Sequence, residues 1–155
     1  MAVGHLTEQN INIARGLIRG ATVIHKFGRN PSVGGTPETI WMYGGTYTYL
    51  TSASTVYVSG ADAQDGAAGT GARTVTVQGL DANYNEIEET LTVDGAASTQ
   101  SFLRVFRAFV ASAGSLQTNK GNVLVSTGAG GGGTVLADIG TVGTGVTFGL
   151  GQTNL

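Results

Sequence analysis

Alternation between apolar and polar residues is the feature of this chain that most constrains its fold. Val75 and Val77 share one face of residues 74–78, while two threonines and a glutamine share the other. Residues 86–93 alternate again, with apolar residues on one face and mainly glutamate and threonine on the other. Residues 81–85, between the two runs, are rich in Asp and Asn, which tolerate tight turns. We therefore predict two half-buried strands joined as an antiparallel hairpin.

Glycine is abundant in the chain, and charged residues are scarce. Of the 155 residues, 26 are glycine, more than twice the usual share of about 7%. Glycine and β-branched residues disfavour long helices, and β-branched residues suit pleated strands. We therefore predict an all-β protein, an antiparallel β-sandwich with Gly-rich loops. The length is that of one domain, which we place at residues 21–155, after an extended or part-helical N-terminal arm at residues 1–20.

Further short runs of β-branched and aromatic residues are bounded by glycine, proline and polar residues, which is typical of strands separated by turns. The glycine pair at 44–45 favours positive φ and predicts a second hairpin, between residues 40–43 and 46–49. The end of the chain, 142–155, is punctuated by glycine and has the alternation of another strand. The other predicted strands are residues 21–27, 55–59, 122–126 and 134–139, and the loops are 29–37, 60–71 and 128–133.

Residues 102–111 support two interpretations. Their apolar residues recur at helical spacing, and a serine before them and a glycine after them could cap an amphipathic helix. The same residues are aromatic and β-branched, which suits a strand buried on both faces. Because the surrounding pattern is β, we predict a strand. Arg104 and Arg107 would then lie on opposite faces, and we expect at least one to pair with an acid of residues 86–89.

No arrangement of residues in the sequence predicts catalysis. The chain has no cysteine, and its two histidines, His5 and His25, are far apart, so we expect no metal site. No serine has a histidine or an acid at the spacing of a catalytic triad. The glycine loops at 69–71 and 128–133 lack the lysine that follows a phosphate-binding loop. We therefore expect no catalytic residue, no cofactor and no enzymatic activity.

The acidic stretch that follows the predicted strand at residues 74–78 could bind calcium or supply catalytic carboxylates. Asp81, Asn83 and Asn85 match the first ligand positions of a calcium loop, but the later positions do not match. We interpret these residues as an Asx-rich hairpin loop. Glu86, Glu88 and Glu89 could suggest paired catalytic carboxylates, but we interpret them as the solvent face of a strand and a turn. We therefore predict neither a calcium site nor catalytic carboxylates in residues 81–89.

Charge is distributed unevenly along the chain. Four basic residues stand against Glu8 alone in the first 37 residues, whereas acids outnumber bases in the remainder. A weakly cationic arm on an acidic body suggests that the arm meets an anionic surface, and the alternative is a solvated arm without a partner. The bases are too few for a nucleic-acid site, and no apolar run is long enough to span a membrane. The predicted contact residues are Arg15, Arg19, Lys26 and Arg29.

Three segments of the sequence resemble the sequences of one protein family. They are IHKFGRNPSVGGTPETIW at 24–41, GTGARTVTVQGLDANYNEIEETLTVDG at 69–95 and SFLRVFRAFVASAG at 101–114. They resemble a virion structural protein family of tailed bacteriophages, in particular the group common in phages and cyanophages of aquatic bacteria. The resemblance covers roughly residues 14–126 and rests on unusual sequence motifs within these three segments.

The resemblance implies a non-enzymatic subunit of a virus particle with a jelly-roll-like fold. On this basis we expect a head decoration, or cement, protein that is made in the host cytoplasm and contacts the major capsid protein or other virion subunits. A homo-oligomer, most plausibly a homotrimer, would shield exposed strand edges. The alternative within the particle is a tail, neck or fibre-base subunit.

A function of a different class is a carbohydrate-binding β-sandwich module. That function needs an aromatic platform, and one aromatic cluster in the sequence could supply it, although a place in the core or in strand pairs explains the same residues. A glycan array with a Tyr47→Ala variant would test the platform. The cluster comprises Trp41, Tyr43, Tyr47 and Tyr49.

Overall fold

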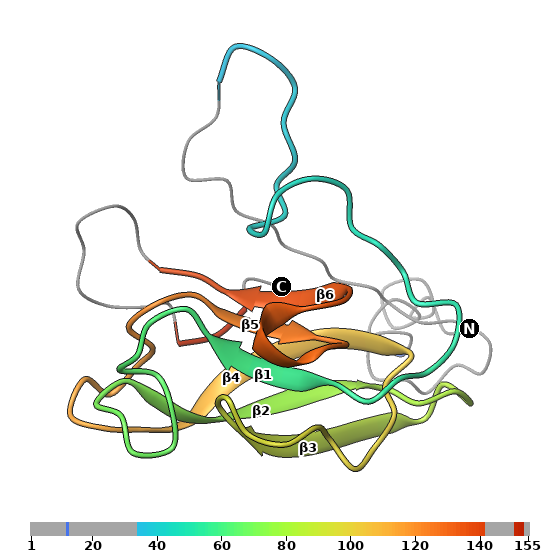
Figure 1. Cartoon of the computed structure of the whole chain (residues 1–155). Helices are drawn as coiled ribbons and strands as arrows, with labels where there is room; N and C mark the ends of the chain where they lie inside the picture. The colour runs from blue at the N-terminus through green and yellow to red at the C-terminus, as the bar shows by residue number, and fades with distance from the viewer. Residues whose placement is uncertain (1–11, 13–33, 142–150, 154–155) are drawn as a thin grey trace, which may run out of the picture.

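In the computed structural model, which describes residue 12 and residues 34–141 and 151–153, the chain forms two antiparallel β-sheets. Each has three described strands, in the order β1-β5-β6 and β3-β2-β4, and Figure 1 shows the first sheet lying over the second. The described part contains almost no helix, so the all-β prediction is confirmed. The elements are β1 (Tyr57–Gly60), β2 (Ala72–Leu80), β3 (Glu86–Thr92), β4 (Arg104–Ala113), β5 (Val123–Ser126), the 3-10 helix η1 (Ala129–Gly131) and β6 (Val135–Ile139).

The first predicted hairpin is confirmed. β2 pairs with β3 in a continuous register, from Thr74 opposite Thr92 to Leu80 opposite Glu86. Val75 and Val77 of β2 are fully buried and Leu91 of β3 is buried, while the glutamates and threonines of β3 lie mostly at the surface. The two-residue period of a half-buried strand therefore identified the correct inward face.

The strand interpretation of residues 102–111 is also confirmed, because β4 pairs with β2 along most of its length. The register shifts at Gly79, so that Phe106 lies opposite no residue of β2 and forms a bulge. Because of this bulge, the buried residues Val105 and Ala108 lie three positions apart instead of two. The helix-like spacing in the sequence therefore comes from a bulged strand.

The expected ion pair between β4 and the acids of residues 86–89 is wrong. Among the described residues, Arg104 donates from Nη1 to the carbonyl oxygen of Leu50 at 2.8 Å, and Arg107 donates to the side chain of Gln152 at 3.2 Å. The acids lie on β3, which is separated from β4 by the whole width of β2. The arginines therefore use nearer carbonyl and amide acceptors.

The core lies between the sheets and takes residues from both. Burial of these side chains removes apolar area from water at roughly 25 cal/mol per Å², which is the main term holding the layers together. Phe102, just before β4, is the largest fully buried side chain. The cluster also includes Val56, Val58, Val75, Val77, Leu91, Val93, Val123, Val125 and Ile139.

The segment between β3 and β4 closes one side of the two layers. Ser98 donates its N–H to the carbonyl oxygen of Val56 at 2.8 Å, and Asp94 donates its N–H to the carbonyl oxygen of Val58 at 2.8 Å. These bonds cover the outer edge of β1. The outer edge of β3 differs, because no strand among the described residues pairs with it.

The second predicted hairpin is wrong. Both central glycines have positive φ (84° and 67°), as predicted, but the hydrogen-bonded turn spans residues 41–44, where Gly44 donates its N–H to the carbonyl oxygen of Trp41 at 2.9 Å. No strand forms on either side of it. The hydroxyl of Tyr47 instead donates to the carbonyl oxygen of Leu136 in β6, at 3.3 Å. The segment is thus held by side-chain contacts rather than by a backbone ladder.

The remaining predicted strands are placed with small shifts, since 55–59, 122–126 and 134–139 correspond to β1, β5 and β6. The arm at 1–20, apart from residue 12, the strand at 21–27 and most of the tail lie outside the described residues. Residues 151–153 extend the sheet β3-β2-β4, the lower sheet in Figure 1, where Gln152 forms a bridge with Phe109 of β4. None of the described helices is both long and apolar enough to cross a membrane.

Candidate functional site

The contact residues predicted from the charge distribution cannot be placed in the fold. Arg15, Arg19, Lys26 and Arg29 all lie outside the described residues. Their contact with an anionic surface therefore stays a prediction.

The Asp-Asn loop between β2 and β3 is a structural turn, as predicted. The Asp81 carboxylate accepts the backbone N–H groups of Asn83 at 2.7 Å and Asn85 at 2.9 Å, and the Asn85 side-chain amide at 3.0 Å. These bonds, first of all the one from the Asn85 side chain, lower the pKa of Asp81. The carboxylate is therefore already occupied by its own loop, which is the geometry of an Asx turn.

Glu89 differs from the other acids of β3. Glu86 and Glu88 are exposed as predicted, but Glu89 is half-buried and accepts the N–H and hydroxyl of Thr99 and the N–H of Gln100, at 2.8 to 3.1 Å. Burial raises the pKa of Glu89, but these bonds outweigh it, and the net pKa is lowered. Its carboxylate fixes the segment that covers β1.

Asp65 is a second fixing point, and sequence reasoning missed it. Its side chain is buried and accepts backbone N–H groups from Ala72, Lys120 and Gly121, at 2.7 to 3.1 Å. One carboxylate thus joins the loop before β2 to the loop before β5. The partners are up to 56 positions away in sequence, so no local pattern announces this role.

Asp138 in β6 is the described acid with the most unusual surroundings. It is only 4% exposed, and its Oδ2 accepts the side-chain amide of Asn122 at 3.2 Å. Its Oδ1 has no hydrogen-bond partner among the described residues. Burial raises the pKa of Asp138 to about 6, and the single bond from Asn122 opposes this only in part. This acid is a titratable group near neutral pH, with one free oxygen.

The aromatic residues of the segment 41–49 form one continuous row. The ring centroids are 5.3 Å apart for Trp41 and Tyr43, 5.0 Å for Trp41 and Tyr47, and 4.8 Å for Tyr47 and Tyr49. The tilted and edge-to-face geometries are those that aromatic pairs prefer. The Arg104 guanidinium lies 5.3 Å from the centroid of Tyr49, so one end of the row is fixed to β4.

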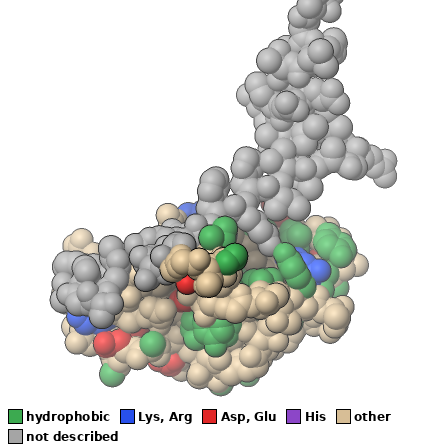
Figure 2. All heavy atoms as spheres, turned by 90° about the horizontal axis from the view of Figure 1, so that it is seen from above, with side chains coloured by type: hydrophobic (Ala, Val, Ile, Leu, Met, Phe, Trp, Pro, Cys, Tyr) green, Lys and Arg blue, Asp and Glu red, His purple; other side chains and the backbone are tan. Residues whose placement is uncertain are grey.

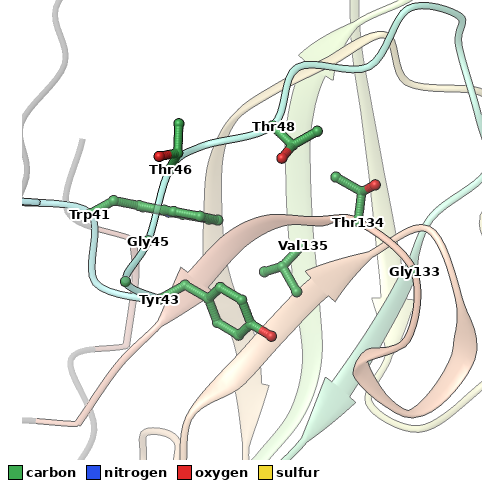
Figure 3. A pocket seen from close by; sticks show the side chains of 9 residues that line it. Trp41, Tyr43, Gly45, Thr46, Thr48, Gly133, Thr134 and Val135 are labelled. Atoms are coloured by element: carbon green, nitrogen blue, oxygen red, sulfur yellow. The ribbon is translucent and has the colours of Figure 1, made fainter.

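The other end of the row opens into a pocket of about 240 Å³. In Figure 3 the rings of Trp41 and Tyr43 extend from the loop toward Val135 of β6, with Thr48 and Thr134 beyond. The lining also includes Thr46, Gly44, Gly45 and Gly133 and contains no charged side chain. On the face shown in Figure 2, hydrophobic side chains lie in patches among neutral polar atoms, and charged side chains are few.

Tyr47 is not one of the residues that line the pocket. Burial is the main reason that the pKa of Tyr47 is raised, and the neighbouring Tyr49 adds to this while Arg104 opposes it. Its hydroxyl bond to β6 fixes the row against the sheet. The four aromatics considered as a possible platform are therefore brought together. Trp41 and Tyr43 line the pocket, whereas Tyr47 contacts β6 and Tyr49 contacts Arg104 of β4.

No group of three or more His, Asp or Glu side chains within the described ranges could hold a metal ion. Comparison of the chain with protein-family models, with curated proteins and with solved structures gives no match. Function is therefore inferred from the residues and their geometry.

Proposed function

We propose that this protein is a structural subunit of a tailed-bacteriophage virion, most plausibly a head decoration protein that braces capsid subunits from outside. The observation that supports this best is that buried and exposed carboxylates of the protein hydrogen-bond to its own loops. Asp65, Asp81 and Glu89 all accept N–H groups of loops, so the surface loops are held in fixed positions. A subunit that acts by contact benefits from such loops, because ordering them during binding would cost free energy.

The proposal includes the finer architecture and the mode of assembly. The two layers would form a jelly-roll-like sandwich that associates as a homotrimer, with the cationic arm docked on an acidic shell. The outer edge of β3 would supply such contacts, since no described strand pairs with it, although Gln100 Nε2 donates to the carbonyl oxygen of Glu88 on β3 at 2.7 Å. Buried area between neighbouring subunits would stabilise the shell by mass action, without chemistry.

The experiment compares phage heads with and without the protein. Removal should lower the temperature at which the heads release DNA, and adding back the purified protein should restore it. Heads that are equally heat-stable in both states would reject the decoration role.

Copy number separates the two positions within the particle. Many copies spread over the shell support decoration, whereas a few copies at one vertex support the alternative of a tail, neck or fibre-base subunit. A charge variant of the arm, Arg15→Glu with Arg19→Glu, should weaken add-back if the arm contacts the shell. The matched change Glu86→Lys on β3 tests the strand edge instead.

A further inference from the structure

The open end of the aromatic row has features that contact with a shell does not require. We propose that the pocket between residues 41–48 and β6 binds a neutral sugar ring, such as a hexopyranose, by stacking on Trp41 and Tyr43. The proposal is independent of the virion role, because the described residues that line the pocket all belong to one chain.

The indole of Trp41 is held in place before any ligand arrives. Its ring centroid lies 5.3 Å from that of Tyr43 and 5.0 Å from that of Tyr47, and Tyr47 is fixed to β6 through its hydroxyl. The Gly44 turn places Trp41 and Tyr43 on the same side of the loop (Figure 3). The electron-rich face of an aromatic ring attracts the polarised C–H groups of a pyranose, and a fixed ring loses little entropy on binding.

Hydroxyl groups surround these rings. The side-chain hydroxyls of Tyr43, Thr46, Thr48 and Thr134 have no hydrogen-bond partner among the described residues, and all four residues line the pocket. Each hydroxyl can donate one hydrogen bond and accept others, as the hydroxyls of a sugar also do. Aromatic faces together with unpaired hydroxyls therefore match the two kinds of surface on a pyranose.

The lining also limits the ligand. None of the described residues that line it is charged, so no described side chain compensates for bringing a phosphate, a sialic acid or a uronic acid out of water. The volume of about 240 Å³ is below the roughly 300–1,000 Å³ of pockets for drug-sized ligands. One neutral ring at the end of a glycan is the ligand class that fits these limits.

The geometry also corrects the test suggested by the sequence. Tyr47 is outside the lining and supports the segment, so Tyr47→Ala would report on folding of the segment as much as on binding. Tyr43 is 50% exposed and lines the pocket, which makes it the informative position. Thr48→Val removes one hydroxyl without changing the size of the side chain.

The intact chain carries its own probe, because Trp41 is its only tryptophan. The experiment titrates the protein with methyl glycosides of glucose, galactose, mannose and N-acetylglucosamine and follows tryptophan fluorescence. At least one should give a saturable change with a dissociation constant on the order of 1 mM, as expected for a small ligand in an open pocket. Sialic acid and glucuronic acid should give none.

Two variants and one control complete the experiment. Tyr43→Ala should weaken binding roughly tenfold and Thr48→Val roughly threefold, whereas Tyr84→Ala, at an exposed tyrosine outside the pocket, should have no effect. Circular dichroism confirms that each variant is folded. The proposal is overturned if no neutral glycoside gives a saturable change, if an acidic sugar binds instead, or if folded Tyr43→Ala binds as well as the original chain.

Discussion

The buried carboxyl group of Asp138 should make the stability of this protein fall as pH rises toward neutrality. The side chain is 4% exposed and has one hydrogen bond, to Asn122, while its other oxygen has no partner in the described chain. An ionised carboxylate in that position loses hydration that a single amide does not replace. We predict that Asp138→Asn, which keeps the shape and removes the charge, stabilises the fold at neutral pH.

The direction and size follow from the pKa of Asp138. Burial raises this pKa from 3.8 to about 6, so the folded chain holds the proton more tightly than the unfolded chain. The contribution of this group to stability is complete below about pH 4 and is lost as pH rises through about 6. The difference between the two pKa values corresponds to about 3 kcal/mol of unfolding free energy above about pH 7.

The assay is urea unfolding of the original chain and of Asp138→Asn at about pH 7.5 and about pH 4. The fluorescence of Trp41 and circular dichroism report the transition. The variant should be more stable by up to about 3 kcal/mol at the higher pH, and the two should be alike at the lower pH. The slopes with urea should be the same, because the exposed surface is unchanged.

Comparison of the two proteins at each pH cancels the titration of the other acids. The change Glu86→Gln is the matched control, because this carboxylate is exposed at the start of β3 and its removal should alter stability little at either pH. A variant that is no more stable than the original at about pH 7.5 would refute the reasoning, as would an advantage of equal size at both pH values.

Three further substitutions and one control test the packing. Gly79→Ala should destabilise by about 2 kcal/mol in thermal melts, because its Cβ would overlap the Arg104 carbonyl oxygen, whereas Gly66→Ala has open space and should be mild. Asp65→Ala leaves three backbone N–H groups without their acceptor and should cost about 3 kcal/mol in urea unfolding. Phe102→Ala should cost about 3–5 kcal/mol and speed amide hydrogen exchange in β2, because it opens a cavity between the sheets.

The sequence was most informative where structure is local. The hairpin of β2 and β3 was predicted because a two-residue period on both sides of a five-residue polar loop leaves few other arrangements. The strand β4 was harder, since a bulge at Phe106 changes the period to one that also fits a helix. Strand patterns near a bulge therefore need the pairing partner before they can be interpreted.

The sequence was misleading at residues 40–49. Gly44 and Gly45 have the predicted positive φ, but the hydrogen-bonded turn is at residues 41–44, and a turn alone does not bring two strands into register. Tyr47 reaches β6, a contact 89 residues away in sequence, and that tertiary contact replaces the expected ladder. Asp65 and Asp138 were missed for the same reason, because their surroundings are made by residues distant in the chain.

The sugar-binding proposal and the virion proposal depend on different residues of the molecule. Sugar binding depends on Tyr43 and Trp41 at the free end of the aromatic row, whereas shell contact would depend on the arm and on the edge of β3. The pocket is formed by the loop and β6 of the upper sheet, and β3 lies in the lower sheet (Figure 1). Tyr43→Ala should therefore weaken sugar binding roughly tenfold and leave the heat stability of decorated heads unchanged. If that variant also failed to stabilise heads, the pocket itself would be the contact with the shell, and the sugar would be a competitor for it.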